Sequence, residues 1–430
     1  MQKEIYQDLK ERNFLYQLTN EDKLPELMNN KKFAFYAGFD PTGDSLHVGH
    51  LLPVMAMRRL QQAGHTPIVL VGGATALVGD PSGKQEARPI LTKEKVAENA
   101  NALKEQLGRF IDFENGNAIF VNNAEWFLDM NFLDFLRDVG SRFSINKMMT
   151  AESVKMRLET GLSYLEFTYM LLQAYDFYIL NKKYDCIFQI GGQDQWGNIV
   201  AGVDLTRRMS QKEVYGMTFP LLTDSSGAKF GKTAAGAVWL DPNRTSIFEY
   251  YQFWRNCDDT DVAKLLGFFT NLPIEEIKEL ASLEAPAINR AKEILAYEAT
   301  KLAHGEKEAE KVYLAACSKF GFSDKENKIK TSSDITKIKP ESTELSEDLP
   351  TYEIDSSTID GDGFWIVQLI TDSGLTTSNG EARRLIKGGG IYLNDIRISD
   401  MNKNITKDDF SNNSAILRAG KKKIRRIILK

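Results

Sequence analysis

Residues 33–71 read FAFYAGFDPTGDSLHVGHLLPVMAMRRLQQAGHTPIVLV, and this stretch decides the fold. A β-rich run at 33–37 leads through a turn into a helical pattern at about 46–63, and a second apolar run follows at 67–71. Strand, helix and strand in this order are typical of a parallel, doubly wound α/β sheet, in which ligands bind at the carboxyl ends of the strands. The same sheet is extended by two more buried-strand candidates, at 118–121 and 185–190.

Length and composition indicate a modular protein without a membrane segment. The chain has 430 residues, of which 42% are hydrophobic, so we expect about two to four domains. Its longest apolar runs stop far short of a membrane span, and its amino terminus does not read as a signal peptide. The three cysteines lie far apart, which argues against a disulfide framework and against a zinc site. We therefore expect a cytoplasmic protein.

Charge is distributed unevenly along the chain. The whole protein carries a net charge of -5, whereas residues 381–430 hold 13 Lys and Arg against 5 Asp and Glu, a balance of +8. An acidic body with a basic end predicts contact with a polyanion at the carboxyl end.

Patterning divides the chain into four segments. The α/β pattern predicts a catalytic domain at 1–245, and a purely helical pattern follows at 246–322. Residues 323–362 are polar, with few large apolar side chains, and read as a linker. The apolar pattern returns at 363–430 as a small α+β module.

Two of the four histidines, His47 and His50, begin the helical pattern after the first strand. At a spacing of three residues they share a helix face. The N–H groups at a helix start attract phosphate, and Gly49 leaves room for a nucleotide against the backbone. This pattern predicts an ATP site, although the motif alone fits equally well a helix start whose histidines hydrogen-bond locally.

A second cationic element, KFGKT at residues 229–233, follows a DSSG turn. Its two lysines could close over a triphosphate, but a KxxK sequence taken alone is usually a solvated turn. Neither a P-loop nor a dinucleotide fold is supported, because GDPSGK at 79–84 lacks the P-loop spacing and no GxGxxG follows a strand.

The pair HVGH and KFGKT resembles the HIGH-like and KMSKS-like signatures of the class I aminoacyl-tRNA synthetases. Further motifs make the chain similar to the bacterial tyrosyl-tRNA synthetases: YAGFDPT at 36–42, GDPSGK at 79–84, Tyr169 with QAYD at 173–176, and QIGGQDQW at 189–196. The resemblance covers the whole chain and implies a Rossmann-like catalytic domain, a helical tRNA domain and an S4-like RNA-binding domain. The implied activity is ATP-dependent ligation of L-tyrosine to tRNA(Tyr) through tyrosyl-adenylate and pyrophosphate.

The resemblance also implies a tyrosine pocket. Selection against phenylalanine requires groups that hydrogen-bond the substrate hydroxyl, and Tyr36 and Asp176 stand where the family has these groups. The family's ligands of the substrate ammonium and carboxyl groups correspond to Asp80, Tyr169, Gln173 and Gln195.

On the ATP side, the implied chemistry needs no protein nucleophile, because the tyrosine carboxylate itself attacks the α-phosphate. Cations and N–H groups stabilise the charge that builds on the leaving pyrophosphate. We expect Mg²⁺ to be carried on the ATP phosphates, with no tightly bound cofactor and no protein metal site. The residues implied in catalysis are Thr42, His47, His50, Lys229, Lys232 and Thr233. Those implied in holding ATP are Gly38, Asp40, Gly49, Gly192, Asp194 and Lys232, with Lys84 and Arg88 as further cationic candidates.

The carboxyl end, LTTSNGEARRLIKGGGIYLN at 375–394, resembles the S4 RNA-binding module. Its helix would bring basic side chains to the tRNA phosphates, and a second basic patch follows near the end of the chain. The family acts as a homodimer, which implies a subunit interface at about 111–150. The residues implied in RNA binding are Arg383, Arg384, Lys387, Lys421, Lys422 and Lys423.

Three alternatives remain at this point. The tryptophan-specific relative would not need Tyr36 together with Asp176, and a small nucleotidylyltransferase with an HxGH site would lack the later domains. An RNA-binding protein that has lost catalysis would not need HVGH, KFGKT and GGQDQ intact.

Overall fold

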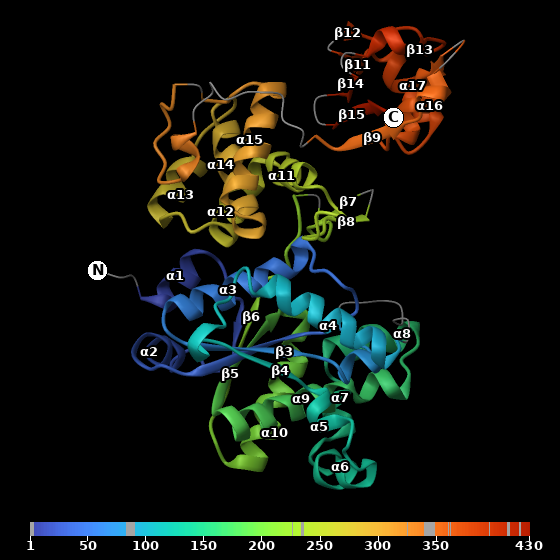
Figure 1. Ribbon diagram of the computed structural model, residues 1–430. Helices are drawn as coiled ribbons and strands as arrows, with labels where there is room; N and C mark the ends of the chain where they lie inside the picture. Colours follow the sequence, from blue (N-terminus) through green and yellow to red (C-terminus); the bar gives the residue numbers. More distant parts are fainter. Residues whose placement is uncertain are drawn as a thin grey trace. The chain divides into compact units, whose positions relative to one another are not determined.

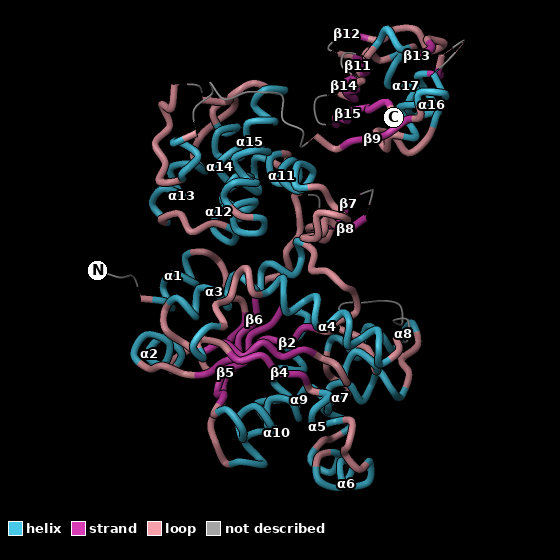
Figure 2. The backbone as a smooth tube through the Cα atoms, in the orientation of Figure 1, coloured by secondary structure: helices cyan, strands magenta, loops and turns pink. Residues whose placement is uncertain are grey.

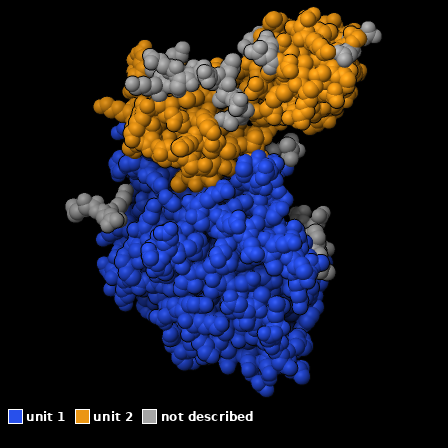
Figure 3. All heavy atoms as spheres, in the orientation of Figure 1, with its two compact units in different colours: residues 1–244, 258–283 blue, residues 245–257, 284–430 orange. Residues whose placement is uncertain are grey.

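A computed structural model describes residues 4–82, 91–225, 227–233, 236–324, 326–338, 349–359, 361, 363–394, 396–410, 413–420 and 423–430. The chain forms two compact units, shown in different colours in Figure 3. Unit 1 comprises residues 1–244 and 258–283, and unit 2 comprises residues 245–257 and 284–430. No helix among the described residues is long and apolar enough to cross a membrane.

Unit 1 is built on a six-stranded sheet in the order β1-β6-β5-β2-β3-β4, drawn in magenta in Figure 2. All neighbouring strands are parallel except β1, which pairs antiparallel with β6. Chain order runs outward from β2 to β4 and then returns to place β5 on the other side of β2. A ligand site is expected at the carboxyl ends of β2 and β5, where this order reverses. The strands are β1 (Gln17–Leu18), β2 (Ala34–Phe39), β3 (Thr66–Val71), β4 (Ile119–Asn122), β5 (Cys186–Gly192) and β6 (Tyr215–Phe219).

Helices cover both faces of this sheet (Figure 1). The strands are therefore buried on two sides, which explains why β3 reads as a continuous apolar run rather than an alternating one. On the face of the longest helix, α9, Tyr36 and Ile68 pack with Phe177 and Leu180 in one core. The helices of the first 244 residues are α1 (Ile5–Glu11), α2 (Leu24–Asn30), α3 (Leu51–Gln62), α4 (Lys93–Leu107), α5 (Ala124–Phe127), α6 (Phe132–Asp138), α7 (Ile145–Met148), α8 (Glu152–Thr160), α9 (Tyr164–Tyr184) and α10 (Trp196–Ser210).

The parallel-rich α/β sheet confirms the predicted fold class, and the four predicted strands correspond to β2, β3, β4 and β5. The predicted helix at 46–63 begins later than expected, with a 3-10 turn at Val48–His50 followed by α3. Pro53 lies in the first turn of α3, where a missing N–H group costs no helical hydrogen bond.

Residues 258–283 hold α12 (Val262–Phe269) and α13 (Ile274–Ala281) and group with unit 1, whereas the sequence pattern joins them to the helical segment at 246–322. The physical reason is a set of buried guanidinium contacts from the start of the chain. Arg12 Nη2 donates to the Leu272 carbonyl at 2.7 Å, and Arg59 Nη2 donates to the Thr270 carbonyl.

Unit 2 contains α11 (Ile247–Arg255), α14 (Ile288–His304) and α15 (Glu306–Phe320), followed by a small mixed-sheet module. The module's five-stranded sheet has the order β12-β11-β14-β15-β9 and packs with its helices around a core of its own. Its elements are β9 (Thr351–Ile354), β10 (Phe364–Trp365), α16 (Ile366–Asp372), α17 (Asn379–Lys387), β11 (Ile391–Leu393), β12 (Ile396–Arg397), β13 (Asn404–Ile405), β14 (Ser414–Ala419) and β15 (Lys423–Leu429).

The segment that the sequence presents as a linker, 323–362, is partly built into both neighbours. Arg290 Nη2 donates to Asn327 Oδ1 at 3.0 Å, which holds the start of the segment against α14. Strand β9 lies in the second half and pairs in parallel with β15. The few apolar residues of this segment, such as Ile354, therefore enter a core supplied by the rest of the module.

Candidate functional site

A cavity of about 420 Å³ opens at the carboxyl ends of β2 and β5. It brings together fourteen of the residues implied in substrate binding and catalysis, which the chain spreads over nearly 200 positions. They are Tyr36, Gly38, Asp40, Thr42, His47, His50, Asp80, Tyr169, Gln173, Asp176, Gly192, Asp194, Gln195 and Lys229.

Tyr36 and Asp176 form the buried end of the cavity. Tyr36 is 1% exposed, and its hydroxyl has no hydrogen-bond partner in the structure. Burial raises the pKa of Tyr36 well above its ordinary value, so the hydroxyl keeps its proton and is a donor. An unpaired hydroxyl at this depth is costly unless a ligand satisfies it.

Asp176, from the middle of α9, is 2% exposed and held by two N–H donors. Trp126 Nε1 donates to its Oδ1 at 2.9 Å, and Asn123 Nδ2 donates to its Oδ2 at 3.1 Å. Burial raises the pKa of Asp176 well above its ordinary value, while these two hydrogen bonds oppose that rise. Because both donors favour the carboxylate, they orient it as an acceptor toward the cavity.

Asp80 lines the same cavity and is 8% exposed. Its Oδ1 accepts from the Ser82 N–H at 2.9 Å, and its Oδ2 accepts from Gln195 Nε2 at 2.8 Å. Burial raises the pKa of Asp80 to about 6. Gln173 belongs to the same network, because Asn198 Nδ2 lies within hydrogen-bond distance of both Gln173 Oε1, at 3.0 Å, and Gln195 Oε1, at 3.2 Å.

Asp40 links this network to the first strand. Its Oδ2 accepts from the Tyr169 hydroxyl at 2.9 Å, and its Oδ1 accepts from the Thr75 hydroxyl at 2.9 Å. Thr75 in turn accepts from Asn123 Nδ2 at 3.1 Å. Asp40, expected on the ATP side, therefore also fixes the orientation of Tyr169.

His47 and His50 stack on each other with ring centroids 3.8 Å apart, so the predicted shared face is confirmed. They also hydrogen-bond locally: His47 Nδ1 accepts from the Gly49 N–H at 3.0 Å, and His50 Nδ1 accepts from the His47 N–H at 3.1 Å. The local hydrogen bonding that the motif also allows is therefore present, and the same two rings line the cavity. In a neutral ring whose Nδ1 accepts, the hydrogen sits on Nε2, which is then a donor.

Gly49 itself is not among the lining residues. A side chain at this position would place its Cβ 2.8 Å from the His47 ring and 3.8 Å from the Phe230 carbonyl oxygen. The His47 ring and the KFGKT loop, rather than open space, thus lie against Gly49. The two signature motifs are in direct contact.

The structure does not describe every residue that the resemblance implies. Lys84 and Arg88 lie outside the described residues, as do Lys421 and Lys422. The backbone of Lys232 and Thr233 forms β7 (Lys232–Thr233), which pairs with β8 (Gly236–Ala237). Of the KFGKT lysines, Lys229 lines the cavity.

Sequence reasoning missed the residues that support the pocket. Asn123, Trp126, Thr75 and Asn198 have no motif of their own, because each acts through a partner far away in the chain. Asn123 directly follows β4, so the rule that ligand sites gather at strand ends could have indicated it. No group of three or more His, Cys, Asp or Glu in the described parts of the chain could hold a metal ion.

In the carboxyl-terminal module, α17 buries Ala382 and Ile386 and exposes its basic residues. Arg383, Arg384 and Lys387 are exposed, and the Arg383 guanidinium lies 5.1 Å from the centre of the Trp365 ring. Lys423 Nζ donates to the Leu375 carbonyl at 3.0 Å and so also holds the chain before α17.

Comparison with known proteins finds similarity along the whole chain. Residues 28–321 match the tRNA synthetases class I (W and Y), and residues 341–427 match the tyrosine–tRNA ligase SYY-like C-terminal domain. The chain is 49% identical over 425 residues to a tyrosine–tRNA ligase of Clostridium botulinum (strain Hall), covering 99% of both chains. It is 48% identical to that of Clostridium tetani over the same length and coverage.

Among solved structures, the chain is similar to a C-terminally truncated mitochondrial tyrosyl-tRNA synthetase of Aspergillus nidulans. The TM-score is 0.65 at 33% identity, and the match covers 73% of this chain and 93% of that one.

Proposed function

The chain belongs to the W and Y family of class I tRNA synthetases and has tyrosine–tRNA ligase activity, and on this premise we propose how its cavity divides between tyrosine and ATP. The observation that carries the proposal is the single cavity itself. Its lining includes the buried residues Tyr36 and Asp176, which we assign to the tyrosine end, and His47, His50 and Lys229, which we assign to the ATP end.

At the buried end, the tyrosine hydroxyl meets one donor and one acceptor. The Tyr36 hydroxyl donates a hydrogen bond to the substrate oxygen, and the Asp176 carboxylate accepts a hydrogen bond from the substrate hydroxyl. This arrangement would satisfy the Tyr36 hydroxyl, which is otherwise buried without a partner. Phenylalanine would leave both groups unpaired.

The substrate ammonium binds next to Asp80, with Tyr169 and Gln173 as further acceptors. The Tyr169 hydroxyl donates a hydrogen bond to Asp40, so its oxygen is oriented as an acceptor for the ammonium. Gln195, which bonds Asp80, faces the substrate carboxyl group. Gly192 and Asp194, at the end of β5, hold the ATP ribose.

The carboxylate of bound tyrosine attacks the α-phosphate of ATP in line and expels pyrophosphate. Thr42, His47 and Lys229 stabilise the negative charge on the leaving phosphates, while His50 lies nearer the ribose. Both histidine rings offer Nε2 as the donor, because Nδ1 already accepts a backbone N–H. Gly38 and Asp40 line the cavity on the ATP side, whereas Gly49 acts indirectly, by leaving room for the His47 ring. The tRNA terminal hydroxyl then attacks the tyrosyl carbonyl and releases AMP.

Three cations, Lys84, Arg88 and Lys232, and the Thr233 hydroxyl complete this side as proposals from the resemblance. The structure does not describe their side chains. Mg²⁺ would enter on the ATP phosphates and neutralise part of their charge. We assign no metal cage to the carboxylates that line the cavity, because Asp40 and Asp80 both accept hydrogen bonds through their two oxygens. We also propose that the protein works in the cytoplasm.

The pH dependence of tyrosine binding tests the tyrosine end of the cavity. The Asp80 carboxylate must be ionised to pair with the ammonium, and its pKa is about 6. As the pH falls through 6 the carboxylate is protonated, so the affinity for tyrosine should drop about tenfold per pH unit below 6 and stay level above 7. Calorimetric titration with tyrosine from pH 5 to 8 measures this.

Asp80→Asn separates Asp80 from other groups that titrate in the site. The variant should bind tyrosine weakly at every pH, without the step near pH 6. A step that persists in Asp80→Asn, or wild-type binding that does not change between pH 5 and 8, would show that another group receives the ammonium.

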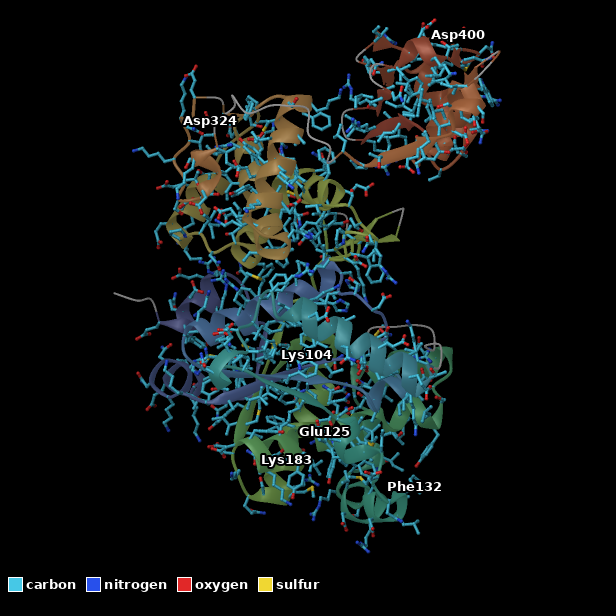
Figure 4. All side chains as sticks on the ribbon, viewed as in Figure 1. Lys104, Glu125, Phe132, Lys183, Asp324 and Asp400 are labelled. Atoms are coloured by element: carbon cyan, nitrogen blue, oxygen red, sulfur yellow. The ribbon has the colours of Figure 1, made fainter. Side chains whose placement is uncertain are left out.

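We further propose that the protein is a homodimer. Exposed large apolar side chains of the described chain gather between residues 128 and 165, as a monomer rarely allows. Helix α6, in this segment, lies at the edge of unit 1, where Figure 4 labels Phe132. The most exposed members are Leu128, Phe132, Leu133, Ile145 and Tyr164, at 50%, 64%, 71%, 67% and 69%.

Leu133→Asp should convert the dimer into a monomer, because a charge at the centre of an apolar interface is left unpaired. Light scattering coupled to gel filtration measures the mass. Ile396→Asp is the matched control, since Ile396 is equally exposed at 71% but lies in the carboxyl-terminal module. A Leu133→Asp protein with the wild-type mass, or a wild-type monomer, would contradict the proposed interface.

A further inference from the structure

The KFGKT loop, residues 229–233, continues a hairpin that begins at Leu222. Phe230 N–H donates to the Leu222 carbonyl at 3.0 Å, and Thr223 pairs with Lys229 in an antiparallel bridge. The position of Lys229 over the cavity therefore depends on what holds residues 222–225.

Residues 222–225 of the loop are held by two side chains at the start of α12. Asp261, 5% exposed, accepts from the Ser225 N–H through Oδ2 at 3.0 Å. Its Oδ1 pairs with Lys264 Nζ at 2.8 Å, and the same ammonium donates to the Thr223 carbonyl at 2.7 Å. These contacts form a closed ring in which one ion pair grips the loop backbone at two points, and we name Asp261 and Lys264 the loop clamp.

A stacking contact supports the same attachment. The Phe230 and Phe269 rings are nearly parallel, at 9°, with centroids 6.4 Å apart, and Phe269 is 1% exposed at the end of α12. Helix α12 thus meets the loop through a charged pair at its first turn and an aromatic ring at its last.

The far side of the loop is fixed against the histidine motif. Gly231 has a φ of +85°, and a Cβ there would lie 3.2 Å from the Gly49 nitrogen. Val238 N–H donates to the Gly231 carbonyl at 3.0 Å, and Val48 N–H donates to the Val238 carbonyl at 2.9 Å. Lys229 is therefore held between two supports, the histidine motif on one side and the loop clamp on the other.

We propose that Asp261 and Lys264 are positioning residues for tyrosyl-adenylate formation, and that they act by setting where the KFGKT loop stands over the ATP end of the cavity. Neither side chain lines the cavity. Because the clamp grips backbone atoms of the loop, its loss shifts Lys229 without removing any group that touches a substrate. A displacement of about 1 Å is enough to cost roughly 100-fold in rate when a stabilising group must meet a developing charge. The inference depends on the proposed role of the loop at the phosphates.

Tyrosine-dependent pyrophosphate exchange, measured while ATP or tyrosine is varied, tests the clamp in the full-length protein. Lys264→Met removes both contacts of the ammonium and should lower kcat/KM for ATP roughly 10- to 100-fold, with KM for tyrosine within about twofold of wild type. Asp261→Asn keeps an acceptor for the Ser225 N–H but loses the charge opposite Lys264, so its effect should be smaller and of the same kind. Lys264→Arg keeps a cationic donor and should recover most of the activity.

Two reference variants separate the possible outcomes. Lys278→Met changes an exposed lysine of α13 and should leave exchange unchanged. Lys229→Met should slow exchange strongly, and if it does not, the proposed role of the loop fails. If Lys229→Met is slow but the clamp variants stay within twofold of wild type for ATP, the clamp inference alone is overturned. A rise in KM for tyrosine well beyond twofold in the clamp variants would also overturn it, because that pattern marks a general structural defect of the cavity.

Discussion

Asp176→Asn should lower kcat/KM for tyrosine by roughly 100-fold or more, the largest effect we expect from a single substitution. The amide has the same shape but carries its own N–H donors, and one of them must face Trp126 Nε1, Asn123 Nδ2 or the substrate. A buried donor opposed to another donor costs about 1–3 kcal/mol on each side, and the lost charge adds to this. Tyr36→Phe removes one neutral hydrogen bond and should cost roughly tenfold.

Phenylalanine gains nothing from either group, so both variants should lose far more activity with tyrosine than with phenylalanine. Exchange assays with each amino acid measure the ratio of the two kcat/KM values. The preference of tyrosyl-tRNA synthetases, on the order of 10⁵, is a known property of the family and not a result of this structure. The expected result is that this ratio shrinks in both variants.

Tyr178→Phe is a matched control, because Tyr178 lies on the same helix as Asp176 but packs against Tyr175 outside the cavity. It should leave the ratio unchanged. An unchanged ratio in Asp176→Asn and Tyr36→Phe would place the hydroxyl-binding groups elsewhere.

Removal of the carboxyl-terminal module should separate the two steps of the reaction. The module has its own core, and β9 belongs to that core, so a clean cut falls after residue 338 rather than at the sequence-predicted boundary of 363. We expect the shortened protein to form tyrosyl-adenylate within about twofold of the wild-type rate, because the whole cavity lies in unit 1. Charging of tRNA should fall by roughly 100-fold or more at physiological salt, since basic contacts supply much of the affinity for nucleic acid.

A full-length variant keeps this test independent of folding. Arg383, Arg384 and Lys387 are exposed, so replacing all three by Gln should leave the module folded. Charging should weaken, and the salt dependence of tRNA binding should decrease by about one unit of slope for each phosphate contact that is lost. Equal loss of both steps in the shortened protein, or normal charging, would contradict the assignment of the module to tRNA.

Local sequence patterns were sufficient to predict some strands and one feature of the site. The strands β2 and β3 were predictable because their apolar runs are continuous and end at turns, and the shared face of His47 and His50 follows from their spacing. Strand β6 was missed although all five of its residues are buried, because the sequence YGMTF holds a glycine and a threonine where an apolar run was sought. Its burial comes from its neighbours in the sheet.

The features that the sequence did not predict depend on residues that are far apart in the chain. The support of Asp176 comes from Trp126 and Asn123, about 50 positions earlier in the chain, and no local motif joins them. In the same way, residues 258–283 are helical by pattern, but their place in unit 1 depends on Arg12 and Arg59 near the start of the chain. Sequence motifs indicated the residues that line the cavity, whereas the residues that support them could be identified only from the fold.

The central claim is that one cavity activates tyrosine with ATP. Pyrophosphate exchange with the purified protein, offered each of the twenty amino acids in turn, tests it most directly. We expect rapid exchange with tyrosine and little with any other amino acid. Exchange driven by tryptophan, or no exchange with any amino acid, would contradict the account.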